Sequence, residues 1–250
     1  MNLLFITSLI IFVSWIVQGI SGFGGGVFML TLLSLVMNIK SAVFTFSFIQ
    51  ALGPLSILLA TKIYKPNIRL MLYLLIGSFL GIFLGTNILK VINTPYMEIF
   101  AGIFFVSIGV FDGLVIFKKE ILNIGAKIEL RHGFLVGIMS GIFSAIVGVG
   151  GPPVAIYLRN IVKEFDEYRY LISLYFVLIV GIRLSMYYLL HVFSHVRYDY
   201  IAYWGISSLA GLWTGRLVSR FINKHYLNLS VPFLTVICGL LLIGKGYLKL

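Results

Sequence analysis

Eight apolar segments, each about as long as a membrane-spanning helix, constrain this chain more than any other feature. A helix needs roughly 20 mostly apolar residues to cross a bilayer. Two further pieces, Val27–Met37 and Pro153–Val162, reach only about half that distance at roughly 1.5 Å per residue. The sequence therefore predicts an all-α integral membrane protein with about eight long membrane helices and two short half-helices. The long segments are Leu3–Ile20, Ser41–Ala60, Leu70–Leu89, Tyr96–Phe117, His132–Val149, Tyr170–Leu190, Tyr200–Leu217 and Val231–Leu248.

Charge supports this class and excludes others. Only 11% of the residues are charged, against about 25% in a typical soluble domain, so the chain cannot cover a water-exposed surface. A soluble enzyme and a nucleic-acid-binding protein are thereby excluded, although the formal charge is +11. In a membrane protein, Lys and Arg concentrate in cytoplasmic loops.

Each short piece follows a glycine cluster, and the order of elements repeats. Gly22-Phe23-Gly24-Gly25-Gly26 and Gly148-Val149-Gly150-Gly151-Pro152 lie in register at an offset of 148 − 22 = 126. A second block matches at 211 − 81 = 130, where Gly81, Gly85, Ile92 and Asn93 correspond to Gly211, Gly215, Ile222 and Asn223. We predict a first membrane repeat at 1–120, a linker at 121–131 and a second repeat at 132–250.

The basic residues predict an orientation. Placing the 61–69 loop and the 118–131 linker in the cytoplasm leaves both termini outside and gives the two halves opposite topologies. Such an inverted repeat is common in secondary transporters. The arrangement places most Lys and Arg inside and Lys40, Lys90, Arg197, Lys245 and Lys249 outside. The inside set is Lys62, Lys65, Arg69, Lys118, Lys119, Lys127, Arg131, Arg159, Lys163, Arg169, Arg216, Arg220 and Lys224.

The glycine breaks predict an anion site at the repeat interface. Non-helical backbone at membrane depth is tolerated only in a protein-lined or watery cavity, and a helix N-terminus presents free N–H groups to anions. Alternatively, the glycines only allow close packing, and nearby polar side chains only satisfy freed carbonyls. Arg183 could neutralise an anion or extend outward. The candidate residues are Gln18, Ser21, Gly22, Gly24, Gly25, Gly26, Ser144, Gly148, Gly150, Gly151, Gln50 and Arg183.

Other motifs favour structural roles. Glycines spaced by four predict close helix packing, Pro54 predicts a kink, Glu98 is expected at the interface, and Cys238 in the core. Gly19-Ile20-Ser21-Gly22 matches the GxSG of intramembrane serine proteases, but no histidine lies at mid-span to act as base. Neither a metal site nor a cofactor is predicted. The packing glycines are Gly77, Gly81, Gly85, Gly211 and Gly215.

The two glycine motifs resemble those of a known family. The run 18–26, Gln-Gly-Ile-Ser-Gly-Phe-Gly-Gly-Gly, is similar to the first-half motif of the sulfite exporter TauE/SafE family, the 4-toluene sulfonate uptake permeases. The run 148–158 resembles its second-half motif more closely, whereas Val27–Leu33 lacks the proline that members often carry. The resemblance implies a multi-pass plasma-membrane transporter of sulfite, organosulfonates or related anions, bound at the two motifs.

The sequence thus predicts a secondary transporter of a small anion rather than an enzyme. An uncoupled anion channel and a non-transporting scaffold subunit are the alternatives. The expected partners are the lipid bilayer and a small anionic substrate, and no nucleic acid. Coupling to H⁺ or Na⁺, the transport direction and assembly as a homodimer stay open.

Overall fold

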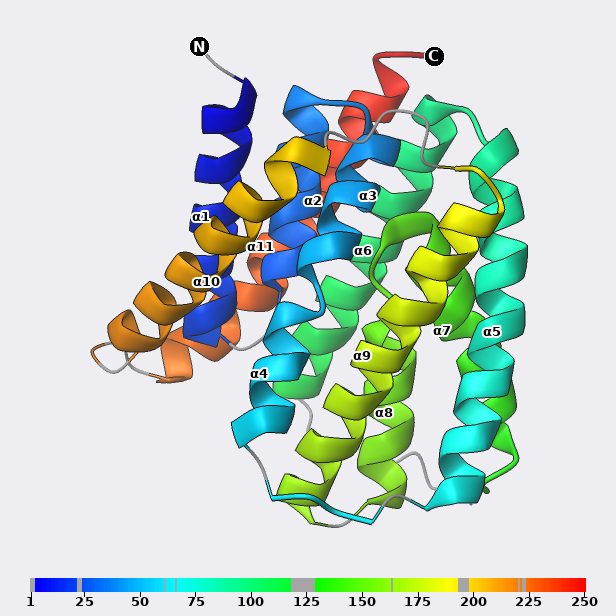
Figure 1. Ribbon diagram of the computed structural model, residues 1–250. Coiled ribbons are helices and arrows are strands. Elements are labelled where there is room, and N and C mark those ends of the chain that lie inside the picture. The colour runs from blue at the N-terminus through cyan, green and yellow to red at the C-terminus, as the bar shows by residue number, and fades with distance from the viewer. Residues whose placement is uncertain are drawn as a thin grey trace. The chain divides into compact units, whose positions relative to one another are not determined.

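Figure 1 shows a computed structural model that describes 3–21, 24–60, 62–65, 67–117, 129–162, 164–192, 198–219, 221 and 224–250. Within these ranges all regular structure is helical. Contacts group the helices into two compact units. Each unit combines helices from both predicted repeats, so the repeat boundary at 121–131 stays a prediction about the sequence.

The described residues of the first unit form six α-helices and a short 3₁₀ turn. α1 and α2 form a hairpin, because the chain leaves the helix at the first glycine cluster and Gly24 takes a φ of 84°. Gly25 N–H then donates to Gln18 Oε1 across the hairpin at 3.0 Å. α2 therefore packs back against α1. The elements are α1 (Leu3–Ser21), α2 (Gly25–Val36), α3 (Ile39–Ile49), α6 (Thr94–Phe117), η2 (Tyr198–Tyr200), α10 (Ile201–Val218) and α11 (Lys224–Tyr247).

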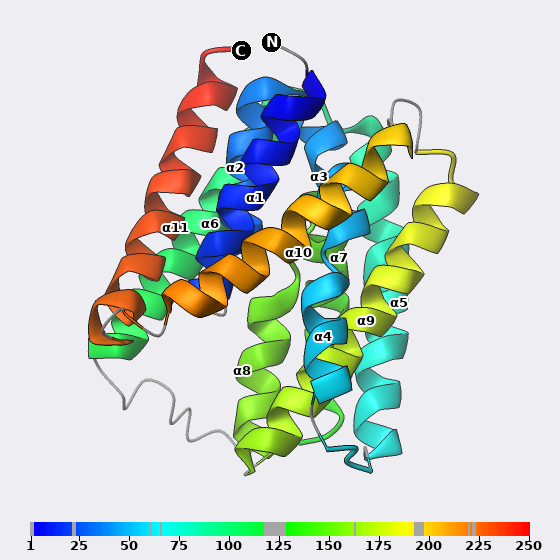
Figure 2. The ribbon, with the colours of Figure 1, turned by 60° about the vertical axis from the view of Figure 1, so that its left-hand side comes forward.

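α6 and α11 pack antiparallel through glycines in the first unit (Figure 2). A Cβ added to Gly109 would lie 2.8 Å from the Pro232 carbonyl oxygen, and one on Gly239 would lie 2.6 Å from that of Gly102. At the offset of 130, Gly102 corresponds to Pro232 and Gly109 to Gly239. The two contacts therefore join corresponding pairs of positions in the predicted repeat. α1 begins and α11 ends at the same end of this unit (Figure 2).

The second unit repeats the hairpin with α7 and α8. Gly148, which ends α7, has a φ of 80°, a backbone conformation that favours glycine. The hydroxyl of Tyr157 in α8 donates to the Leu130 carbonyl at 2.9 Å, so the far end of α8 returns to the start of α7. The helices are α4 (Leu52–Ala60), α5 (Ile68–Val91), α7 (His132–Val147), α8 (Gly151–Ile161) and α9 (Phe165–Leu189).

The glycines spaced by four do permit close packing, as predicted. α5 runs parallel to α7, and a Cβ on Gly85 would lie 2.8 Å from Ala145 Cβ and 2.9 Å from the Ile142 carbonyl. In the first unit, a Cβ on Gly215 would lie 2.8 Å from Gly19 Cα. Gly85 corresponds to Gly215 at the offset of 130, and Gly19 corresponds to Ala145 at the offset of 126. The α5–α7 and α1–α10 contacts therefore follow the register of the sequence repeat.

The segment predicted as a single span at Ser41–Ala60 forms two helices. α3 ends at Ile49 and α4 begins at Leu52, leaving Gln50 and Ala51 outside both. Pro54 lies in the first turn of α4, where its missing N–H is tolerated. The helix is therefore interrupted before Pro54 rather than kinked at it, and Gln50 directly follows the end of α3.

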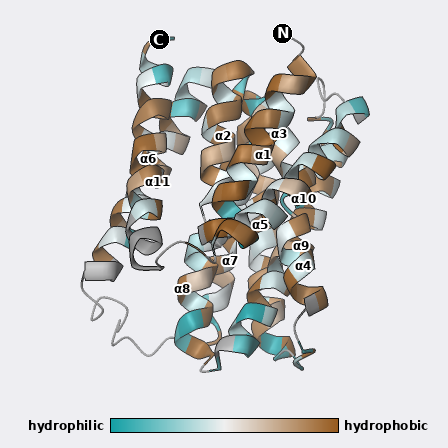
Figure 3. Ribbon diagram, turned by 90° about the vertical axis from the view of Figure 1, so that its left-hand side faces the viewer, coloured by the Kyte–Doolittle hydropathy of each residue, from teal (hydrophilic) through white to brown (hydrophobic). Residues whose placement is uncertain are grey.

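Six apolar stretches of the described chain are long enough to cross a membrane, compared with about eight predicted. α7 has 16 residues and is too short, because it stops at Gly148. α10 is not among the six spans either. Large apolar side chains face outward, including Trp213 at 67% exposure, as expected against lipid. Figure 3 shows hydrophilic residues gathered toward helix ends.

Candidate functional site

Arg183 is the centre of a polar cluster at the second glycine break. It lies in the last third of α9, and its side chain is 0% exposed. Nη1 donates to the Ser144 carbonyl at 3.0 Å, to Ser144 Oγ at 2.9 Å and to the Gly148 carbonyl at 2.8 Å. These carbonyls end α7, where a helix carries partial negative charge. The guanidinium therefore stabilises the backbone where it leaves the helix.

Gln50 contributes the other contact of this cation. Nη2 of Arg183 donates to Gln50 Oε1 at 2.6 Å. Nε is buried and has no hydrogen-bond partner, and no described carboxylate pairs with the guanidinium. Burying a charge without a counter-ion is costly. The cluster thus carries a net positive charge that an anion could neutralise.

A second polar chain reaches the same break from α5 and α9. The Ser140 hydroxyl donates to the Gly150 carbonyl at 2.5 Å and accepts from Tyr175 at 2.8 Å. The Tyr175 hydroxyl lies 2.7 Å from Ser78 Oγ. All three side chains are at least 98% buried. No sequence motif had indicated Ser140, Tyr175 or Ser78, since their partners are distant along the chain.

The first break is arranged differently. Gln18 Oε1 accepts from the first N–H of α2, so this side chain caps a helix start. Gly26 has no room for a side chain, because a Cβ there would lie 2.6 Å from the Phe46 ring. A cavity of about 10 Å³ beside Gly24 is lined by apolar residues and Thr235. That volume suits one water molecule at most.

The candidate residues form two sets, one in each unit. Ser144, Gly148, Gln50 and Arg183 come together in the second, and Gly150 and Gly151 follow directly in the chain. The other set is in the first unit. There, Gly22 lies outside the described residues, and only the backbone of Ser21 is described.

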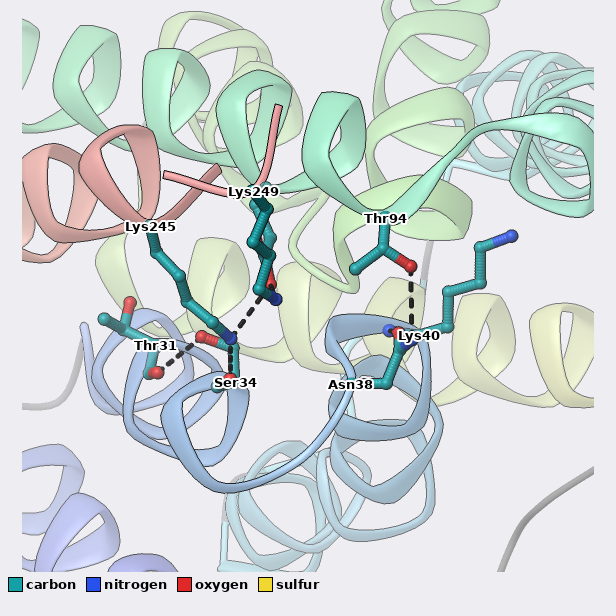
Figure 4. Close-up of polar contacts among 8 residues, drawn as sticks. Thr31, Ser34, Asn38, Lys40, Thr94, Lys245 and Lys249 are labelled. Carbon is teal, nitrogen blue, oxygen red and sulfur yellow. Dashed lines mark hydrogen bonds and ion pairs between the residues drawn. The ribbon is translucent and has the colours of Figure 1, made fainter. Parts of the chain in front are cut away.

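Glu98, which is expected at the interface, lies near the start of α6, and its side chain is 0% exposed. Its Oε1 pairs with Lys245 Nζ at 2.9 Å and Lys249 Nζ at 2.8 Å. Lys245 also donates to the Ser34 carbonyl, and Figure 4 shows Lys245 of α11 and Lys249, which follows α11, extending toward α2. This cluster connects the start of α6 to the ends of α2 and α11 in the first unit.

The folded chain is a multi-pass α-helical membrane protein in which two glycine-broken helix hairpins carry the polar residues. That class includes secondary transporters with discontinuous helices. The family model "Sulfite exporter TauE/SafE" matches residues 7–244. The chain therefore belongs to the sulfite exporter TauE/SafE family, whose members are membrane transporters rather than enzymes. Comparisons with curated proteins and with solved structures gave no match.

Proposed function

We propose that this protein is a secondary transporter of sulfite, an organosulfonate or a related sulfur-containing anion. One observation carries the proposal: Arg183 places a fully buried positive charge at a glycine break, and none of the described carboxylates pairs with it. An intramembrane charge generally marks a functional site. An oxyanion has the charge to neutralise the guanidinium and the oxygens to accept its free Nε–H.

Packing supports an inverted repeat as the transport architecture. In the predicted repeat, α11 corresponds to α6 at an offset of 130 residues. The two helices pack antiparallel, and the offset converts the Gly109–Pro232 contact into the Gly239–Gly102 contact. Equivalent helices that run in opposite directions are expected when two repeats have opposite topology. Alternating access by inverted repeats then exposes the anion to one side at a time.

The second unit also supports the proposed orientation in the plasma membrane. α5 and α7 start at the same end, and Tyr64 of the 62–65 segment donates to Glu164 at 3.3 Å. That end collects described basic residues, which we place in the cytoplasm; both termini are placed outside. These residues are Lys62, Lys65, Arg69, Arg131, Arg159 and Arg169.

Sulfite uptake into proteoliposomes tests the function. A transporter shows saturable flux, and imposed pH and Na⁺ gradients identify its coupling. Flux that neither saturates nor responds to those gradients would instead indicate a channel. No flux, and no thermal shift with sulfite, thiosulfate, sulfoacetate, taurine or toluenesulfonate, would refute the proposal and favour a scaffold subunit.

A further inference from the structure

We propose that Ser140 and Tyr175 are positioning residues that hold one peptide bond, between Gly150 and Gly151, with its N–H available to the transported anion. This inference rests on the proposed function and assigns the main-chain donor of that site. The two glycine breaks differ in whether a side chain occupies the first N–H of the short helix.

At the offset of 126, Gly25 corresponds to Gly151, and each is the first residue of its short helix. Gln18 Oε1 already occupies the N–H of Gly25 at 3.0 Å. Ser144 corresponds to Gln18, but its Oγ accepts from Arg183 instead. The capping contact of the first break thus has no counterpart from Ser144 in the second.

Two prolines leave Gly151 as the main-chain N–H donor in the first three residues of α8. The first N–H groups of a helix have no intrahelical acceptor, but Pro152 and Pro153 carry no N–H. Gly151 is therefore the only residue among the first three of α8 with a main-chain donor. Arg183 lies at the preceding turn, where its Nη1 binds the Gly148 carbonyl at 2.8 Å.

The direction of this donor is set by Ser140. The peptide is trans, so the Gly150 carbonyl and the Gly151 N–H point in opposite directions. Ser140 holds the carbonyl at 2.5 Å, which turns the N–H away from Ser140. Without that bond a peptide flanked by two glycines can rotate, because neither residue restricts its backbone. A rotated peptide would present a carbonyl oxygen to the anion.

Tyr175 and Ser78 extend this control. Tyr175 has one hydroxyl hydrogen, which it donates to Ser140 at 2.8 Å. The Tyr175 hydroxyl also lies 2.7 Å from Ser78 Oγ, whose own hydrogen is donated to the Leu74 carbonyl at 2.7 Å. The chain from Tyr175 through Ser140 ends at the Gly150 carbonyl, and hydrogen bonds in such chains strengthen one another. Ser140 should therefore matter most, Tyr175 less and Ser78 least.

The test is sulfite uptake by Ser140→Ala, Tyr175→Phe and Ser140→Thr. Loss of one charge-assisted donor costs about tenfold or more in affinity, so Ser140→Ala should raise the KM at least tenfold with a maximal rate within threefold of wild type. Tyr175→Phe should raise the KM less, and Ser140→Thr, which keeps the hydroxyl, should restore it. The ligand-free Tm of each variant is measured in parallel.

Two matched controls remove hydroxyls away from the break. Thr86→Val loses a bond within α5, to the Ile82 carbonyl at 2.7 Å. Tyr157→Phe loses the bond to the Leu130 carbonyl. Both should leave the KM unchanged. If wild type transports sulfite and Ser140→Ala keeps its KM, the positioning role is wrong while the proposed function stands. If wild type transports no anion, the proposed function itself fails. Should Ser140→Ala not fold, an unchanged KM in Tyr175→Phe would overturn the inference.

Discussion

Arg183→Gln separates the charge at the second break from its structural contacts. The variant removes the positive charge and keeps an amide donor. Four contacts of 2.6–3.0 Å are weakened or lost, because the shorter amide has one donor nitrogen where the guanidinium uses two. At about 1 kcal/mol lost per contact, the total loss is about 4 kcal/mol.

Relief from burying a charge in the membrane opposes that loss by about 3 kcal/mol. The net destabilisation is then about 1 kcal/mol, or a fall of about 2–4 °C in Tm. The effect on anion binding is much larger. A unit charge about 4 Å from the anion contributes about 4 kcal/mol at an effective dielectric constant of 20, which corresponds to about 1,000-fold in affinity.

The assay combines the concentration dependence of sulfite uptake with the Tm of the ligand-free protein. Arg183→Lys should retain part of the affinity, because the charge remains without the planar fork. Arg159→Gln, which removes a cation from the end of α8, is the matched control and should bind sulfite normally. Sulfite affinity within threefold of wild type in Arg183→Gln would show that the buried charge does not serve the anion.

Three further predictions concern the fold and its orientation. Gly81→Leu should lower the free energy of unfolding by at least about 1–3 kcal/mol, because a Cβ there would lie 3.0 Å from Gly141 Cα. Gly205→Ala should not lower the Tm, because a Cβ on Gly205 has nothing within 4 Å. Equal Tm values for the two variants would contradict the packing argument. Glu98→Ala leaves two ammonium groups without their carboxylate and should cost about 3–5 kcal/mol, whereas Glu129→Ala breaks an exposed pair with Arg131 and should cost at most about 1 kcal/mol; similar thermal shifts would argue against the Glu98 cluster. In a background without Cys238, cysteines at Lys65 and Arg159 should react from the cytoplasmic side and one at Lys249 from the outside, and labelling of all three from one side would rule out the proposed orientation.

Much of the framework could be predicted from the sequence, because its signals are local or periodic. Apolar length indicates helices that cross a bilayer, and glycine clusters indicate where helices end. Gly85 and Gly215, which correspond in the predicted repeat, both lie at close contacts between helices. Arg183 could be singled out because a charge is conspicuous in an apolar segment.

The polar partners were not predictable, because they depend on residues far apart in the chain. Gln50 meets Arg183 across 133 positions and Glu98 meets Lys249 across 151. No local pattern marks Ser140 as the hydroxyl that holds the Gly150 carbonyl. Pro54 did signal an irregularity, but its place in the first turn of α4 moved the break to Gln50.

The sequence by itself determined that this chain is a helical membrane protein with two glycine breaks in register, because hydrophobic length and glycine spacing act within one segment. Only the tertiary structure decided that the breaks differ in chemistry. Gln18 folds back to occupy the N–H of Gly25, whereas Ser144 turns toward Arg183. Side-chain direction follows from packing against neighbouring helices, and equivalent positions in a repeat need not have equivalent neighbours.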